Sequence, residues 1–172
     1  ITSPPPPPNR SNILDSMYDS NNKTIHTILA IEAGGTTFKV SSMKLDEESL
    51  HSMAIERLPL ENARIIATQT PQETMKEIQE YCNEIFKTCG SISAVGIACF
   101  GPIQLNKEES NYGSITSTPK KEWRDFNIVK AVKEITRCDK IAFDTDVNAP
   151  ALVESMVSGL KSLAYITVGT GV

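Results

Sequence analysis

Thr145-Asp146-Val147-Asn148-Ala149-Pro150 joins a short apolar segment to a helical pattern of apolar residues. Residues 141–143 before it are predicted to form a buried strand, and apolar residues recur at helical spacing after it. Asp146 therefore falls on a strand-to-helix corner, where open α/β sheets place their ligands. A carboxylate at such a corner can accept a proton from a bound hydroxyl, or it can simply favour the helix dipole. The stretch by itself leaves both interpretations open.

Helix signals predict three helices in the chain. Thr70-Pro71-Gln72-Glu73 has the form of a capping box, and Gly90 ends the apolar stripe that follows it. Asp125 is the expected N-cap of a second amphipathic helix. Asn148 is the expected N-cap of the third helix, which Gly159 closes.

Apolar and alternating runs predict strands between these helices, at residues 27–31, 38–43, 51–58, 94–100, 141–143 and 163–168. The strand at 94–100 is wholly apolar, as expected at the centre of a sheet. The first two strands are joined by Glu32-Ala33-Gly34-Gly35-Thr36-Thr37. A glycine turn of this kind exposes backbone amides that a phosphate can approach, although an ordinary structural turn would look the same.

Trp123 is the only tryptophan in the chain, and it follows the loop that begins at Gly101-Pro102. A tryptophan beside such a loop could form the floor of a sugar pocket. A buried structural role is the favoured interpretation, because large aromatic side chains are most often used for packing.

Composition limits the classes of function. The formal net charge of -4 argues against a nucleic-acid partner, because neutralising phosphates requires surplus lysine and arginine. No apolar run approaches membrane-spanning length, so no membrane partner is expected. The 4 cysteines lack the spacing of a zinc site, which favours free thiols in a reducing compartment and hence a cytoplasmic location.

Residues 1–24 contain the unbroken run Pro4-Pro5-Pro6-Pro7-Pro8 and little that could form a core. We therefore expect a disordered proline-rich tail, since such a segment cannot offset its ordering entropy. The chain begins at Ile1 and stops at Val172 within a glycine-rich turn, so we also expect it to be truncated.

Five motifs spread from about Ile28 to the last residue carry a resemblance to a known family. They are Ile31-Glu32-Ala33-Gly34-Gly35-Thr36, Phe100-Gly101-Pro102, Tyr112-Gly113-Ser114-Ile115-Thr116 with Thr118-Pro119-Lys120, Thr145-Asp146-Val147-Asn148, and Ile166-Thr167-Val168-Gly169-Thr170-Gly171. In this order they resemble the ROK sugar kinases, and within that group the bacterial-type fructokinases.

The resemblance implies an α/β protein with the actin-like ATPase fold. Two RNase-H-like lobes would bind sugar and ATP in the cleft between them. Residues 25–160 would form the first lobe, a mixed sheet with helices, and residues 161–172 the first strand of the second. The adenosine site and a structural zinc cluster would follow Val172. A homodimer is a possible assembly.

The resemblance also implies roles for individual residues. Asp146 matches the catalytic base. Gly101 and Pro102 match the loop that borders the sugar, and Thr145 joins Asp146 there. The phosphate and ATP site comprises two motifs, Glu32, Gly34, Gly35, Thr36 and Thr37, then Gly169, Thr170 and Gly171. No metal ligand is expected in this part of the chain.

One departure concerns the residue after the first phosphate motif. The family often has lysine there, whereas this chain has Thr37 and carries Lys39 two positions further on. In a strand this spacing keeps Lys39 on the same face as Thr37.

The resemblance implies ATP-dependent phosphorylation of a hexose at the 6-hydroxyl, a reaction of carbohydrate metabolism. The expected hexose is fructose, which would be converted to fructose 6-phosphate. Mg²⁺ would accompany ATP. The alternatives are a non-catalytic ROK-type sugar-sensing protein and an inactive fragment. The 172-residue chain alone is expected to be inactive, since most of the nucleotide site would lie beyond it.

Overall fold

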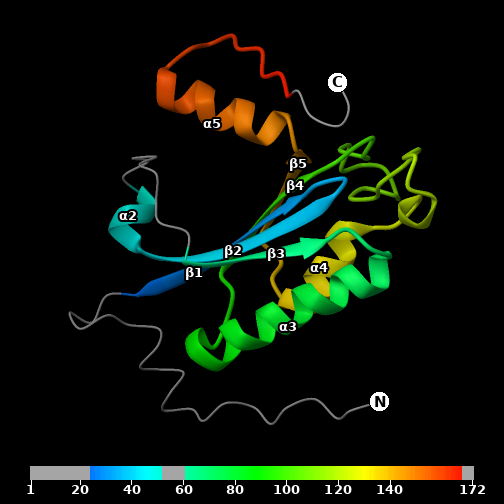
Figure 1. The fold of residues 1–172 in the computed structure, drawn as a ribbon. Coiled ribbons are helices and arrows are strands. Elements are labelled where there is room, and N and C mark those ends of the chain that lie inside the picture. Colours follow the sequence, from blue (N-terminus) through cyan, green and yellow to red (C-terminus); the bar gives the residue numbers. More distant parts are fainter. Residues whose placement is uncertain (1–23, 52–60, 168–172) are drawn as a thin grey trace.

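The structure, a computed structural model, describes residues 24–51 and 61–167 (Figure 1). Its single five-stranded sheet has the order β3-β2-β1-β4-β5. The strands are β1 (Ile25–Ala33), β2 (Thr37–Asp46), β3 (Glu61–Ala67), β4 (Ala94–Cys99) and β5 (Ile141–Thr145). The helices are α2 (Glu47–His51), α3 (Pro71–Cys89), the short 3-10 helix η1 (Lys121–Trp123), α4 (Ile128–Thr136) and α5 (Asn148–Ser158).

The sheet is mixed. Strands β1, β2 and β3 form an antiparallel meander, whereas β1, β4 and β5 run parallel to one another. Ala33 on β1 pairs with Cys99 on β4, which in turn pairs with Thr145 on β5. The carboxyl ends of the three parallel strands therefore lie in one row, and the segments that follow them start side by side.

Helices α3 and α4 lie beneath the sheet in Figure 1, and the core fills the space between them and the strands. The predicted capping box of α3 is confirmed. The side chain of Thr70 accepts a hydrogen bond from the backbone of Glu73, whose carboxylate accepts one from the backbone of Thr70. Gly90 ends the helix, as predicted. The apolar stripe of α3 contributes Met75, Ile78, Cys82, Ile85 and Cys89 to the core.

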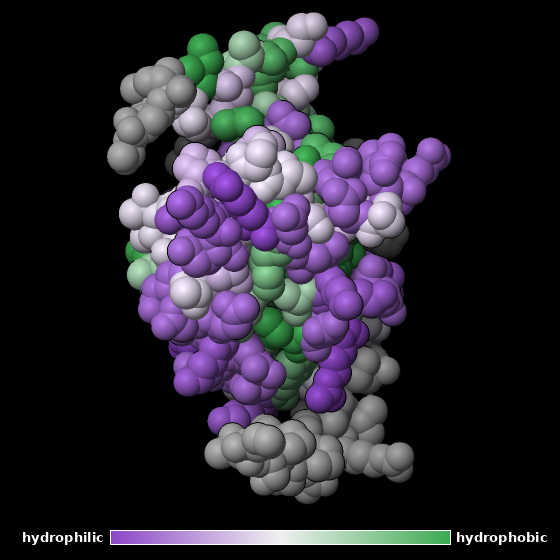
Figure 2. Space-filling model, turned by 90° about the vertical axis from the view of Figure 1, so that its right-hand side faces the viewer, coloured by the Kyte–Doolittle hydropathy of each residue, from purple (hydrophilic) through white to green (hydrophobic). Residues whose placement is uncertain are grey.

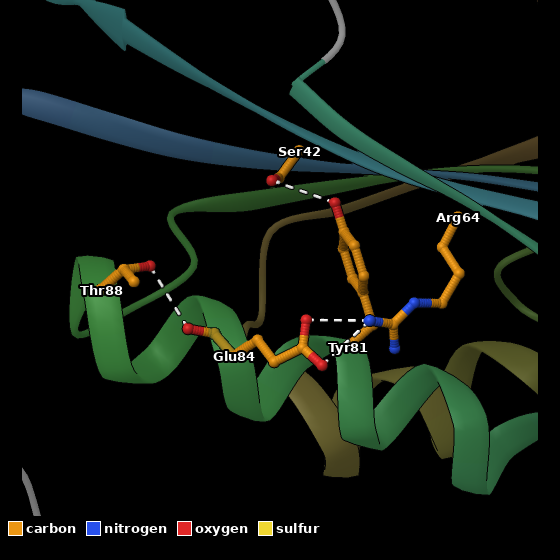
Figure 3. A network of polar contacts seen from close by, with 5 residues as sticks. All are labelled: Ser42, Arg64, Tyr81, Glu84 and Thr88. Carbon is orange, nitrogen blue, oxygen red and sulfur yellow. Dashed lines mark hydrogen bonds and ion pairs between the residues drawn. The ribbon is translucent and has the colours of Figure 1, made fainter.

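A polar network fixes α3 against the outer strands of the sheet (Figure 3). Arg64 on β3 donates to both carboxylate oxygens of Glu84 at 2.9 Å and lies over the ring of Tyr81. The hydroxyl of Tyr81 is 3.2 Å from that of Ser42 on β2. An exposed ion pair adds little stability, so the main effect of the network is to orient the helix.

Trp123 is buried, which confirms its structural interpretation. Its ring stacks on Phe38 of β2 at a centroid distance of 5.2 Å and meets the rings of Phe100 and Phe126 edge to face. Its indole N–H donates to the carbonyl of Gln69 at 2.8 Å. A side chain that is 1% exposed cannot form the floor of an open sugar pocket.

The strand predicted at residues 51–58 was wrong at its start, because His51 ends helix α2; residues 52–60 lie outside the described part of the chain. The third strand is Glu61–Ala67 instead. It was overlooked because it is an edge strand: Ile66 is buried, but Ile65 is 70% exposed and charged residues interrupt the apolar pattern.

Two predicted N-caps were also wrong. Asn127, not Asp125, caps α4 by accepting a hydrogen bond from the backbone of Lys130. Asp125 instead has a positive φ of 60° in the preceding turn. Asn148 is the first residue of α5, and its backbone N–H donates to the hydroxyl of Thr145. Both errors arose because sequence alone does not show where the preceding chain leaves its extended conformation.

The end of the described chain differs from the prediction as well. Residues 163–167 form no strand and are exposed. Helix α5, which Figure 1 shows above the sheet, buries none of its residues. Hydrophobic residues gather at the top of Figure 2, where α5 and the following segment lie. A strand requires a partner with free backbone groups, and an apolar sequence does not reveal whether that partner is present.

None of the helices within the described ranges is long and apolar enough to cross a membrane.

Candidate functional site

The predicted site residues that the structure describes meet at the carboxyl ends of β1, β4 and β5. The backbone N–H of Phe100 donates to the carbonyl of Ala33 at 2.8 Å, and that of Asp146 donates to the carbonyl of Cys99 at 2.9 Å. These bonds place the glycine turn after β1, the loop with Gly101 and Pro102, and the corner with Thr145 and Asp146 in adjacent positions. Gly169, Thr170 and Gly171 lie outside the described residues.

The glycine turn is closed by a hydrogen bond from the N–H of Gly34 to the carbonyl of Thr37 at 3.0 Å. Thr68, which follows β3, supports the turn through its hydroxyl to the Gly34 carbonyl and its N–H to the Thr36 carbonyl. Within the described part of the chain, the N–H groups of Gly35 and Thr36 have no acceptor. Two free amides in one turn are suitable donors for an anion such as phosphate.

We predict that Gly34→Ala destabilises the protein by about 1–3 kcal/mol, because a Cβ at this position would lie 2.6 Å from the Thr37 carbonyl oxygen. Gly35→Ala is the matched control, since its Cβ would meet only the Lys120 side chain, at 4.0 Å. Urea unfolding followed by circular dichroism measures both. Equal stability of the two variants would contradict the close approach in the turn.

The environment of Asp146 favours proton acceptance. Partial burial raises the pKa of this carboxyl above its ordinary 3.8, a hydrogen bond from its own backbone N–H lowers it, and the negative charge of Glu32 raises it. A carboxylate with a raised pKa is a better match for proton transfer near neutral pH.

Glu32 itself is held by an ion pair across the hairpin. Lys39 lies opposite Glu32 in the register of β1 and β2, and its ammonium is 3.0 Å and 3.2 Å from the two carboxylate oxygens. The ammonium of Lys39 is therefore directed to the carboxylate of Glu32.

Sequence reasoning missed two residues that build this site. One oxygen of Asp144 accepts from the backbone of Thr145 at 2.7 Å and from the side chain of Asn148 at 2.9 Å, which fixes the corner. Its place was a usable signal, because Asp144 lies next to the predicted strand at residues 141–143 and directly before the corner. Thr68 gave no such signal, since its contact with the glycine turn spans 34 residues.

No group of three or more His, Cys, Asp or Glu is arranged to hold a metal ion in residues 24–51 and 61–167. The cysteines are free and buried. Burial raises the pKa of Cys82 and of Cys99 to about 12, so both are protonated thiols near neutral pH.

Comparison with curated proteins identifies fructokinases as relatives. The chain is 40% identical over 143 residues to the fructokinase of Lactococcus lactis subsp. cremoris, covering 83% of this chain and 43% of that protein. It is 36% identical over 155 residues to the fructokinase of Zymomonas mobilis subsp. mobilis, covering 88% and 47%. The chain thus spans less than half the length of these relatives.

Solved structures share the fold. A ROK family glucokinase from Streptomyces griseus, in complex with glucose and AMPPNP, superposes with a TM-score of 0.52 at 19% identity and covers 76% of this chain and 36% of that one. An inorganic polyphosphate/ATP-glucomannokinase from Arthrobacter sp. strain KM gives 0.53 at 18% identity, covering 76% and 48%. The predicted actin-like ATPase fold is confirmed.

The predicted resemblance is confirmed over nearly the whole described region, because the sequence profile of the ROK family matches residues 28–172. With this match and the relatives above, the chain belongs to the ROK family.

Proposed function

We propose that this chain is part of an ATP-dependent sugar kinase that phosphorylates a hexose at its 6-hydroxyl, with fructose as the favoured substrate. One observation carries the proposal: Asp146, a carboxylate with a raised pKa, follows β5 at the same edge of the sheet as the turn with two free backbone amides that follows β1. The fructokinase relatives support fructose as the acceptor.

In this proposal Asp146 accepts the proton of the sugar hydroxyl while the hydroxyl oxygen bonds to the γ-phosphorus of ATP. The bond from that phosphorus to the bridging oxygen breaks, and ADP leaves with the electron pair. The amides of Gly35 and Thr36 hold phosphate oxygens. Gly101, Pro102 and Thr145 border the sugar, and Gly169, Thr170 and Gly171 form a second phosphate loop.

Mg²⁺ accompanies ATP in this proposal. Mg²⁺ prefers oxygen ligands, and the phosphate oxygens of ATP would supply them at this edge of the sheet. When bound, the ion neutralises charge on the phosphates. A structural zinc site beyond Val172 and a cytoplasmic location are further parts of the proposal. The buried free cysteines agree with a reducing compartment.

A chimera tests the proposed activity. Residues 28–172 would replace the matching segment of the Lactococcus lactis fructokinase, and ADP release would be followed with fructose, glucose and mannose as acceptors. We expect saturable turnover with the highest kcat/KM for fructose. A folded chimera that binds sugar and ATP without turnover would contradict the proposal and favour a sugar-sensing role.

The raised pKa of Asp146 predicts a pH-dependent effect on stability. The folded state holds the proton of Asp146 more tightly than the unfolded state does. The stability that this proton contributes is therefore complete below the ordinary pKa of 3.8 and is lost as the pH rises through the raised pKa. Asp146→Asn removes this loss. The Tm of the variant minus that of the wild type should therefore increase from acid to neutral pH.

Thermal unfolding of both proteins across this pH range measures the difference. Glu122→Gln, a change of an exposed carboxylate, controls for the loss of one negative charge. A Tm difference for Asp146→Asn that decreases toward neutral pH would show that the pKa is lowered in the folded state.

A further inference from the structure

A half-buried lysine lies over the glycine turn. A Cβ built on Gly35 would lie 4.0 Å from Cε of Lys120, and no other heavy atom outside its chain neighbours comes within this distance. Cε is bonded directly to the ammonium nitrogen, so the positive charge of Lys120 lies close to the turn. The two segments are 85 positions apart in the sequence, and their proximity is a property of the fold alone.

The framework that supports the turn also holds Lys120. The backbone N–H of Lys120 donates to the hydroxyl of buried Thr118, and its carbonyl accepts from the N–H of Trp123. Trp123 stacks on Phe38, in the strand that leaves the turn. It also donates to Gln69, whose neighbour Thr68 is hydrogen-bonded to the turn. The backbone of Lys120 is therefore fixed relative to the amides of Gly35 and Thr36.

The two lysines near the turn differ in their partners. The ammonium of Lys39 is occupied by the carboxylate of Glu32 at 3.0 Å. The ammonium of Lys120 has no hydrogen-bond or ion-pair partner in the described part of the chain. The ammonium of this half-buried residue and the two free backbone amides of the turn are three donors without an acceptor, and an anion bound at the turn would complete them.

We propose that Lys120 is a phosphate-binding residue, which contacts a triphosphate held by the backbone amides of Gly35 and Thr36. This inference rests on the proposed kinase function and adds a cationic ligand to its first phosphate site. A lysine acts on phosphate as a point charge, so the contact needs closeness to the turn more than an exact orientation.

Inorganic tripolyphosphate, titrated into the 172-residue chain, tests this contact. It contains no adenosine, so it reports on the phosphate contacts alone. The amide resonances of Gly35 and Thr36 in ¹⁵N–¹H NMR spectra give the Kd. The variants are Lys120→Gln, Lys120→Arg and Lys121→Gln, the last being the matched control because Lys121 is the exposed neighbour with the same charge.

We expect saturable shifts of both amides in the wild type and a Kd about 10-fold higher in Lys120→Gln, as for the loss of one charge-assisted hydrogen bond. Lys120→Arg should retain most of the affinity, and Lys121→Gln should match the wild type. Unchanged dispersion in the NMR spectra shows that each variant is folded.

Two results would overturn the inference while leaving the turn as a phosphate site: an unchanged Kd in Lys120→Gln, or an equal loss in Lys120→Gln and Lys121→Gln. The second result would mean that only the overall charge of the surface matters. A wild-type chain whose Gly35 and Thr36 amides do not respond would overturn both the inference and the phosphate site of the proposed function.

Discussion

Asp146→Ala should reduce turnover of the fructokinase chimera by about 10²–10⁴-fold, the usual effect of losing a general base. The carboxylate lies at the corner after β5, and burial and the charge of Glu32 raise its pKa, so it is suited to accept the hydroxyl proton. Sugar binding should persist, because the loop at Gly101 and Pro102 is unchanged. Coupled ADP release measures turnover, and isothermal titration measures sugar affinity.

Two further variants separate the loss of the base from damage to the corner. Asp146→Asn keeps the shape of the side chain and should be as inactive as Asp146→Ala. Asp144→Asn retains a carbonyl oxygen that can accept from Thr145 and Asn148, so it should keep most of the activity. Near-normal turnover in Asp146→Ala would exclude Asp146 as the base.

Trp123→Ala should lower the free energy of unfolding by about 3–5 kcal/mol, the range seen when a large aromatic residue is removed from a core. Trp123 is buried against Phe38, Phe100 and Phe126, and its contact with Phe38 joins the segment that carries Lys120 to the sheet. Urea denaturation followed by far-UV circular dichroism measures the loss, because the variant has no tryptophan fluorescence.

Trp123→Phe is the control for this change. It keeps an aromatic ring in the cluster but loses the hydrogen bond to the carbonyl of Gln69, so we expect a clearly smaller loss than for alanine. If alanine and phenylalanine destabilise the protein equally, the hydrogen bond to Gln69 and not the aromatic packing is the main contribution of Trp123.

Local signals were sufficient for much of the fold. The capping box at Thr70, the apolar stripe of α3 and the terminal Gly90 were predicted as the structure has them. The central strand β4 was also recognised, because burial on both faces leaves an uninterrupted apolar run. Prediction failed at the edge strand β3 and at the N-caps of α4 and α5, where the neighbours that decide the outcome come from elsewhere in the chain.

In the candidate site, too, some features follow from local sequence and others depend on distant parts of the chain. The sequence by itself determined that Gly34, Gly35 and Asp146 follow strands, because strand periodicity and turn chemistry involve only neighbouring residues. Only the tertiary structure decided that Lys39 pairs with Glu32, that Thr68 supports the turn and that Lys120 lies over Gly35. These contacts depend on the register of the sheet and on the packing of Trp123, which join segments distant in sequence. The charge of Glu32 reaches Asp146 for the same reason: the parallel pairing of β1 with β4 and of β4 with β5 brings the ends of β1 and β5 to one edge of the sheet.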